Sequence, residues 1–389
     1  MGGILVERRK YLQIPGPTNV PERVLRALST PLVNHRGPEF EKLLEKCVGG
    51  LKKIFGTEND ILIFPSSGSG ALESVIVNLF SPGDTIVASS IGVFSDRIGV
   101  IGEKYNLNVI RLEKEWGESV KAEDIRKLLD DDKDQKIKAV FTTHNETATC
   151  VANDIEELAK AVKDSNHPAL FVVDAISSLA CLPIEVDKWG IDVVVGASQK
   201  GLMLPPGMGI VTLNQSAWDL SEKATMPKWY WDYKAVKARM EIGQFPYTPP
   251  TTLLFGLSES IDILEEEGLD NVLERHKLLA TAIRTAVEAM GLELIAEKGY
   301  QSDAVTGINL PEGINYKDLA GLLSEKYAVV IGGGLQKLQG KIFRIGHMGS
   351  IHKADVYAIM CSVEASLHEL GYDVELGTAA KAITQVFNK

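Results

Sequence analysis

The stretch Val193-Val194-Val195-Gly196-Ala197-Ser198-Gln199-Lys200-Gly201 decides the fold that we expect for this chain. Its apolar, β-branched beginning is typical of a buried strand. Lys200 follows that strand beside small residues, so we expect it at the mouth of a sheet. Burial at such a place lowers the pKa of a lysine and favours the neutral amine that attacks carbonyl groups. The alternative for Lys200 is a solvated charge at a strand end.

A second apolar run, Ala169-Leu170-Phe171-Val172-Val173-Asp174, ends in an acid. A lysine that binds a carbonyl group, with an acid on a neighbouring strand, is the pairing that pyridoxal phosphate chemistry needs. A carboxylate beside a pyridinium nitrogen stays ionised and keeps that nitrogen protonated. The alternative for Asp174 is the cap of a following helix.

Strand-like and helix-like segments alternate around these two runs. The expected strands are Ile61–Phe64, Thr85–Ala88, Asn108–Leu112, Ala139–Thr142, Leu170–Val173, Asp192–Val195 and Gly209–Leu213. The expected helices include Pro38–Phe55, Ala71–Phe80, Ala122–Asp130 and Ile155–Asp164. Repeated β-α-β units predict an α/β fold with a mostly parallel seven-stranded sheet covered on both faces. Ligands of such sheets bind beyond the carboxyl ends of the strands.

The pattern divides the chain into three parts. Residues 1–21 form a turn-rich arm that cannot make a regular element by itself. Residues 22–265 form the large domain, and residues 266–389 form a smaller α+β domain. The expected elements of the smaller domain are the helices Leu269–Met290, Lys317–Tyr327 and Lys353–Leu370 and the strands Leu292–Ala296, Ala304–Leu310, Ala328–Ile331 and Ile342–Ile345.

The composition predicts a soluble globular protein. The chain has 389 residues, of which 45% are hydrophobic, enough for two domains and a large core. A formal net charge of -11 argues against a nucleic-acid or acidic-membrane partner. No signal peptide, membrane span or metal-binding histidine spacing is visible. Four cysteines without CxxC spacing favour a reducing compartment, which we expect to be the cytoplasm.

A glycine- and serine-rich turn follows the predicted strand Ile61–Phe64 and precedes a helix. Ser67, Gly68 and Ser69 would present backbone N–H groups and hydroxyls at a helix N-terminus, an arrangement that binds phosphate. The turn is neither a Walker loop nor a full GxGxxG dinucleotide motif. The alternative is a plain turn capped by a serine.

Two further residues follow predicted strands. Phe94 comes after Thr85–Ala88 and can stack on a planar heteroaromatic ring, or else pack in the core. Thr147 comes after Ala139–Thr142 and can donate to a ring hydroxyl, or else belongs to a capped loop. Both therefore suit a bound aromatic cofactor without requiring one.

Arg344 lies inside the apolar segment Ile342-Phe343-Arg344-Ile345-Gly346. A buried arginine needs an anion, and its forked guanidinium suits the α-carboxylate of an amino acid. An internal salt bridge is the alternative. We find no second basic residue placed for a distal carboxylate, which favours substrates with small side chains.

These motifs resemble those of the class V pyridoxal-phosphate aminotransferases of fold-type I, specifically the alanine/serine–glyoxylate (serine–pyruvate) group. The matching motifs follow the family's order along nearly the whole chain. They are Pro15-Gly16-Pro17-Thr18, Ser67-Gly68-Ser69-Gly70, Asp174-Ala175-Ile176-Ser177-Ser178, Ser198-Gln199-Lys200, Pro205-Pro206-Gly207, Tyr247-Thr248-Pro249-Pro250-Thr251 and Arg344-Ile345-Gly346.

The resemblance implies a role for each matching residue. Lys200 would hold the aldehyde of pyridoxal 5′-phosphate and act with Asp174 as the catalytic pair. The implied cofactor contacts are Ser67, Gly68, Ser69, Phe94, Thr147, Asp174, Gln199, Lys200, Tyr247 and Thr248. Gly16 and Arg344 would bind substrate, and Thr248 would reach the phosphate of the other subunit in a homodimer with shared active sites. The chain departs from some relatives in carrying Phe245 in place of a tyrosine, with a tyrosine at Tyr247 instead.

The implied reaction is a ping-pong transfer of an amino group from alanine or serine to glyoxylate or pyruvate. Ureidoglycine–glyoxylate and 2-aminoethylphosphonate transamination are alternatives within the family, whereas a cysteine desulfurase would need a reactive loop cysteine. A nicotinamide dehydrogenase using the Gly68 turn is the rival from another class. A yellow colour of the purified protein would favour the pyridoxal-phosphate enzyme.

Overall fold

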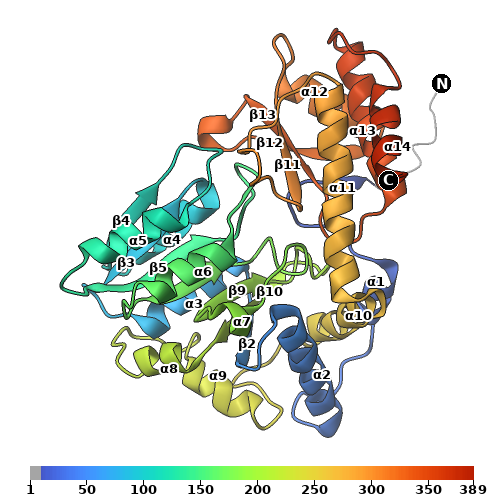
Figure 1. The fold of residues 1–389 in the computed structure, drawn as a ribbon. Helices are drawn as coiled ribbons and strands as arrows, with labels where there is room; N and C mark the ends of the chain where they lie inside the picture. The colour runs from blue at the N-terminus through green and yellow to red at the C-terminus, as the bar shows by residue number, and fades with distance from the viewer. Residues whose placement is uncertain (1–9) are drawn as a thin grey trace.

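The computed structural model describes residues 10–389, and its large sheet has seven strands (Figure 1). In sheet order these are β2 (Asp60–Ser66), β10 (Gly207–Leu213), β9 (Val193–Ala197), β8 (Leu170–Asp174), β5 (Ile137–Thr143), β3 (Thr85–Ser90) and β4 (Asn108–Glu113). Strand β10 runs antiparallel to both of its neighbours, and the other neighbouring pairs are parallel. The predicted mostly parallel seven-stranded sheet is therefore confirmed.

Alternate residues of each strand enter two separate cores, one on each face of the sheet, because successive side chains point to opposite faces. In β8, Phe171 and Val173 belong to one core, and Leu170 and Val172 belong to the other. All four side chains are at most 6% exposed. Each such burial contributes roughly 1.5–3 kcal/mol, which explains why an unbroken apolar run lies at the centre of the sheet.

Helices supply the other half of each core. On one face lie α2 (Pro38–Phe55), α5 (Ala122–Asp131), α6 (Ile155–Asp164), α7 (Val186–Trp189) and α10 (Thr251–Glu267). On the other lie α3 (Gly68–Leu79), α4 (Val93–Lys104), α8 (Gln215–Ser221) and α9 (Tyr233–Met240). The sequence pattern predicted α2, α3, α5 and α6 but not α4, whose Gly99 and Gly102 lower its helix propensity.

A second sheet has four strands in the order β1 (Tyr11–Gln13), β12 (Val329–Gly333), β13 (Ile342–Gly346) and β11 (Val305–Asn309). Strand β1 comes from the predicted N-terminal arm and pairs in parallel with β12. The arm therefore forms a regular element after all, because a distant strand supplies its backbone partners. The first nine residues of the arm lie outside the described residues.

The predicted strand Leu292–Ala296 is wrong. Only Leu294 pairs there, through an isolated bridge to Ile308. Leu292 and Ala296 are buried at 6% and 9% exposure, so their apolar character reflects packing of a loop against the core. An apolar run too short to show its periodicity cannot distinguish these two cases.

Four helices pack against the second sheet around a third core. They are α11 (Leu269–Ala289), α12 (Tyr316–Lys326), α13 (Lys353–Glu369) and α14 (Thr378–Phe387). Figure 1 shows α11 running from α10, beside the large sheet, to the second sheet. A further helix, α1 (Glu22–Leu28), follows the arm and packs on α10. The division into residues 22–265 and 266–389 stays a prediction; residue 265 lies in the last turn of α10.

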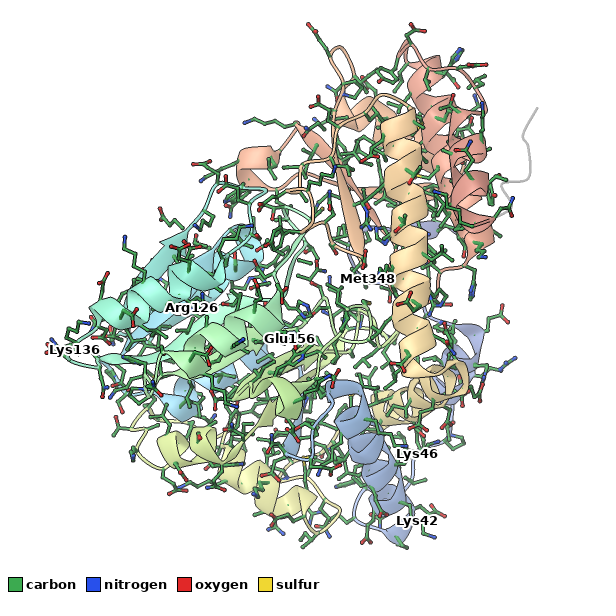
Figure 2. All side chains as sticks on the ribbon, in the orientation of Figure 1. Lys42, Lys46, Arg126, Lys136, Glu156 and Met348 are labelled. Carbon is green, nitrogen blue, oxygen red and sulfur yellow. The ribbon has the colours of Figure 1, made fainter. Side chains whose placement is uncertain are left out.

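Segments next to the large sheet and to the second sheet meet at a small apolar cluster near Met348 (Figure 2). The cluster consists of Cys181, Leu182, Ala304 and Met348. Among the labelled side chains of the same view, Lys46 of α2 forms an ion pair of 2.6 Å with Asp262 of α10. Within residues 10–389, no helix has the length and apolar character needed to cross a membrane.

Candidate active site

The predicted site residues gather where the parallel strands of the large sheet end. Asp174 is the last residue of β8, and in register it lies between Thr143 of β5 and Val195 of β9. Lys200 follows the end of β9. A pocket at this edge is lined by Ser67, Gly68, Ser69, Leu72, Phe94, Arg97, Asn145, Thr147, Asp174, Ile176, Ser177, Gln199 and Lys200. Eight of the predicted site residues thus share one pocket.

Lys200 is partly buried at this pocket, and its Nζ donates a hydrogen bond to the carbonyl oxygen of Pro15. Burial lowers the pKa of Lys200 to about 8, and the positive charge of Arg344 lowers it as well, whereas Asp174 opposes the shift. A lysine with this pKa presents a neutral amine far more readily than an exposed one. The alternative of a solvated charge does not describe Lys200.

Asp174 is 4% exposed, and its Oδ1 accepts a hydrogen bond of 2.9 Å from the backbone N–H of Ile176. Burial raises the pKa of Asp174 to about 6, which the Ile176 bond and the charges of Arg97 and Lys200 partly offset. A further cation beside the carboxylate would favour its charged form. This environment fits a protonated pyridine nitrogen.

The N-terminus of α3 lies in the same pocket and suits a phosphate. Ser67 is the N-cap of α3, and its Oγ accepts from Gly70 N at 3.3 Å. The predicted alternative of a serine cap therefore occurs, yet the other N–H groups of the first turn stay available for an anion. Gln199 also lines the pocket, and its buried Oε1 has no hydrogen-bond partner within residues 10–389. A buried unpaired amide of this kind is expected to serve a ligand.

Ile176 was not predicted as a site residue. It lines the pocket together with Phe94, and a Cβ added to Gly68 would lie 2.6 Å from its Cδ1. The glycine in the turn therefore lets the first turn of α3 approach Ile176 closely. The only signal in the sequence was a large apolar side chain among the small residues that follow Asp174.

Thr147, in the turn of a two-stranded sheet, contacts Arg344 of the four-stranded sheet. Thr147 lies in the turn between β6 (Asn145–Glu146) and β7 (Val151–Ala152). Arg344 is 5% exposed; its Nη1 donates to the Thr147 carbonyl at 2.6 Å and its Nε to the Gly333 carbonyl at 2.8 Å. The ion pairs formed within residues 10–389 do not include Arg344. Since a guanidinium has five N–H donors, it can still bind a carboxylate.

Gly16 places the N-terminal arm over Lys200. Its φ of 101° lies in the region that favours glycine, and an added Cβ would lie 2.7 Å from Lys200 Cε. Thr18 anchors the arm, because its N–H donates to Gln199 O at 3.2 Å and its Oγ1 to Lys200 O at 3.1 Å. Gly16 therefore lies beside the reactive amine, where the sequence predicted a substrate contact.

Tyr247 and Thr248 do not line the pocket of their own chain. The ring of Tyr247 stacks on Tyr230 at 4.5 Å between centroids, and its buried hydroxyl lacks a partner within the described chain. Thr248 is exposed. Phe245, at the position where some relatives carry tyrosine, is 3% exposed and packs on Phe40. The roles of Tyr247 and Thr248 stay predictions about a second subunit.

Arg97 is a basic residue of the pocket that the sequence did not single out, and the expectation that no second basic residue is placed for a distal carboxylate stays a prediction. The Nη1 of Arg97 donates to Ser69 Oγ at 2.8 Å, and its guanidinium lies 4.8 Å from the ring centroid of Phe94. Positions 94 and 97 share one face of α4 because they lie three residues apart on a helix. Because no helix was predicted there, nothing in the sequence pattern connected these two residues.

A buried lysine of lowered pKa, an acid for a pyridine nitrogen and a helix N-terminus for a phosphate define a pyridoxal-phosphate enzyme. Comparison with known proteins then identifies the family. The family model for class-V aminotransferases matches residues 10–355. The chain belongs to this family, and it is a pyridoxal-phosphate-dependent aminotransferase of fold-type I.

Individual relatives match nearly the whole chain. It is 40% identical to a serine–glyoxylate aminotransferase of Hyphomicrobium methylovorum, covering 97% of this chain and 95% of the relative. It is 38% identical to an L-aspartate–glyoxylate aminotransferase of Paracoccus denitrificans, covering 97% and 96%. The crystal structure of ureidoglycine–glyoxylate aminotransferase from Bacillus subtilis superimposes with a TM-score of 0.93 at 29% identity, covering 99% and 100%.

Proposed function

We propose that this aminotransferase moves the amino group of a small amino acid, alanine or serine, to glyoxylate or pyruvate in a ping-pong reaction. The observation that carries the proposal is that charged groups from two sheets act on Lys200, because, in addition to burial, Arg344 lowers the pKa of its amine and Asp174 raises it. The Lys200 amine and the Asp174 carboxylate come from the large sheet, and the Arg344 guanidinium comes from the second. The similarity to serine–glyoxylate aminotransferase supports glyoxylate as the acceptor.

The residues of the pocket would hold the cofactor at three places. Ser67, Gly68, Ser69 and Gln199 would bind the phosphate, Asp174 would face the ring nitrogen, and Phe94 would stack on the ring, with Thr147 beside its hydroxyl. Pyridoxal phosphate, when bound, supplies the electron sink that lets the Cα proton of an amino acid leave.

The chain's own side chains account for the proton transfers. Arg344 binds the α-carboxylate of the donor and so orients its Cα toward Lys200. The amine of Lys200, neutral in part because its pKa is about 8, takes the proton from Cα as a general base and, as a general acid, would deliver it to the C4′ atom of the cofactor. The arm at Gly16 covers the amine and excludes water from it.

A homodimer with shared active sites is part of the proposal. The exposed position of Thr248 and the unpaired hydroxyl of Tyr247 support it, because both polar groups lie outside their own chain's pocket. We also propose a cytoplasmic enzyme, since the cysteines of residues 10–389 are all free thiols.

Arg97 gives a specific reason to test a second class of donor. It offers a cation at the pocket, as an amino acid with a second carboxylate would need. The aspartate–glyoxylate relative and the ureidoglycine–glyoxylate structure make aspartate and ureidoglycine the donors to compare. 2-Aminoethylphosphonate stays the further alternative, because its phosphonate is also an anion.

The experiment is a panel of amino donors against glyoxylate and pyruvate, using purified holoenzyme and following single half-reactions by the change in cofactor colour. The proposal expects alanine or serine with glyoxylate to give the highest kcat/KM. If kcat/KM is higher with aspartate, ureidoglycine or 2-aminoethylphosphonate, that compound is the donor in place of alanine and serine. Lys200→Ala serves as the inactive reference.

A further inference from the structure

Glu146 is a fully buried acid that the proposed reaction leaves without a role. It is the last residue of β6 and is 0% exposed. Burying a carboxylate is unfavourable unless hydrogen bonds compensate it. Burial accordingly raises the pKa of Glu146, while hydrogen bonds from neighbouring backbone N–H groups lower it. These hydrogen bonds connect Glu146 to the segments that supply the N–H groups.

Three backbone hydrogen bonds show which segments Glu146 holds. Its Oε2 accepts from Phe94 N at 2.9 Å and from Ser95 N at 2.7 Å, and its Oε1 accepts from Ala148 N at 2.9 Å. Phe94 and Ser95 belong to the first turn of α4, where the helix dipole favours a negative charge. One carboxylate therefore joins the N-terminus of α4 to the turn after β6.

Gly92 shows how closely this carboxylate fits. A Cβ added to Gly92 would lie 2.5 Å from Glu146 Cγ and 2.8 Å from its Oε2. The φ of Gly92 is 175°, extended backbone that any residue adopts, so glycine is needed there for space alone. Any side chain at position 92 would therefore collide with the carboxylate of Glu146.

The turn that Glu146 holds also contains the contact of Arg344. Thr147 lies between Glu146 and Ala148, and its carbonyl accepts from Arg344 Nη1 at 2.6 Å. The guanidinium of Arg344 is therefore connected to the backbone of Phe94 by two hydrogen bonds and by the chain that joins Thr147 to Glu146.

We propose that Glu146 is a positioning residue that fixes the ring of Phe94 relative to the guanidinium of Arg344. This inference rests on the proposed placement of the cofactor ring against Phe94 and of the substrate carboxylate at Arg344. Glu146 acts through backbone groups of both partners and touches neither ligand. It sets the angle between the cofactor plane and the substrate, on which the rate depends steeply.

The main test is Glu146→Gln in the holoenzyme. Glutamine keeps the shape but replaces one acceptor oxygen by an NH₂ group, so one acceptor is lost where three donors converge. We expect hydrogen exchange of the amides that face the new NH₂ group, either Ala148 or the pair Phe94 and Ser95, to rise at least about tenfold, since they lose protection with their bonds. The visible circular dichroism of the bound cofactor should fall, and kcat/KM should fall roughly 10- to 100-fold.

Gly92→Ala provides a second route to the same effect, because its methyl group displaces the carboxylate without removing its charge. It should reproduce the loss of dichroism and the faster exchange. Gly99→Ala is the matched control on the same helix, since its added Cβ meets only the end of the Arg111 side chain at 3.2 Å and the edge of Val109 at 3.3 Å. The control should leave both signals unchanged.

Unchanged dichroism and unchanged amide exchange in Glu146→Gln would overturn the inference. If that variant does not fold, a folded Gly92→Ala protein with normal dichroism overturns it equally. Repeating the exchange measurement on cofactor-stripped protein tests the hydrogen bonds independently of the reaction. Faster exchange and lost dichroism in an enzyme that accepts none of the proposed donors would contradict the proposed substrates and leave the role of Glu146 supported.

Discussion

The two sheets present their functional charges in different ways. The large sheet carries Lys200 and Asp174 beyond or at the carboxyl end of a strand, where the edge of the sheet opens into the pocket. The second sheet carries Arg344 in the middle of β13, paired in register with Gly307 on one side and Gly332 on the other. A charge at a strand end needs a pocket, whereas a charge within a strand needs neighbours small enough to leave it room.

The electrostatics of the two sheets also differ. Burial raises the pKa of Asp174 and lowers the pKa of Arg344, so in each group burial disfavours the charged form and an opposite charge would favour it. Arg344 has two carbonyl oxygens as partners, while Asp174 has one backbone N–H. The comparison predicts that the large-sheet groups control chemistry and cofactor, and that Arg344 controls substrate affinity.

Loss of the reactive amine should have the largest effect. We expect Lys200→Ala to abolish the visible absorbance of the lysine-bound cofactor and to lower turnover at least about 1,000-fold, because no other group takes the Cα proton. Absorbance spectra and steady-state rates measure both. Lys188→Ala, an exposed lysine of α7, is the control. Normal transamination by Lys200→Ala would remove the basis of the comparison.

The buried acid predicts a pH dependence of stability in the cofactor-free protein. The pKa of Asp174 rises from 3.8 to about 6 on folding. Its contribution to the free energy of unfolding is therefore fully present below pH 3.8 and is lost as pH rises through 6. That difference corresponds to about 3 kcal/mol. Urea unfolding of wild type and Asp174→Asn at several pH values measures it. The variant should lack this loss, and parallel pH profiles would contradict the assigned burial.

Arg344→Lys sharpens the comparison from the side of the second sheet. Lysine keeps the charge but loses the fork, so we expect kcat/KM for the amino donor to fall roughly 30-fold, or about 2 kcal/mol. Most of the change should appear in KM, with the cofactor spectrum unaltered. Arg126→Lys on the exposed face of α5 is the control. A fall confined to kcat would show that Arg344 acts in the chemical step and not in substrate affinity.

The smallest effect concerns the second subunit. Thr248→Ala should weaken cofactor binding about fivefold, or about 1 kcal/mol, because one hydrogen bond to the phosphate is lost. Equilibrium dialysis measures the affinity, and analytical ultracentrifugation establishes whether the chain is a dimer. Thr281→Ala, an exposed threonine of α11, is the control. Unchanged affinity in a dimeric Thr248→Ala protein would contradict a shared site.

The seven strands of the large sheet were predictable because each is an apolar run of strand length between turn residues. Lys200, Asp174 and the Ser67–Ser69 turn were predictable for the same reason, since parallel strands end at one edge. Helix α4 was not predictable, because its glycines weaken the helical signal. The place of Arg97 at the site was therefore not predictable either. The strand β1 was not, because three residues of a turn-rich arm become a strand only when β12 supplies partners.

The sequence by itself determined the alternating fold and the chemical type of each reactive residue, because these follow from local patterns of apolar and polar side chains, and its motifs resemble those of the family that the comparison identified. The tertiary structure decided which residues meet. Arg344 reaches Thr147, Glu146 reaches Phe94 and the arm at Gly16 reaches Lys200 across long separations in the chain. Such contacts depend on the packing of two sheets and an arm, and no local pattern records them.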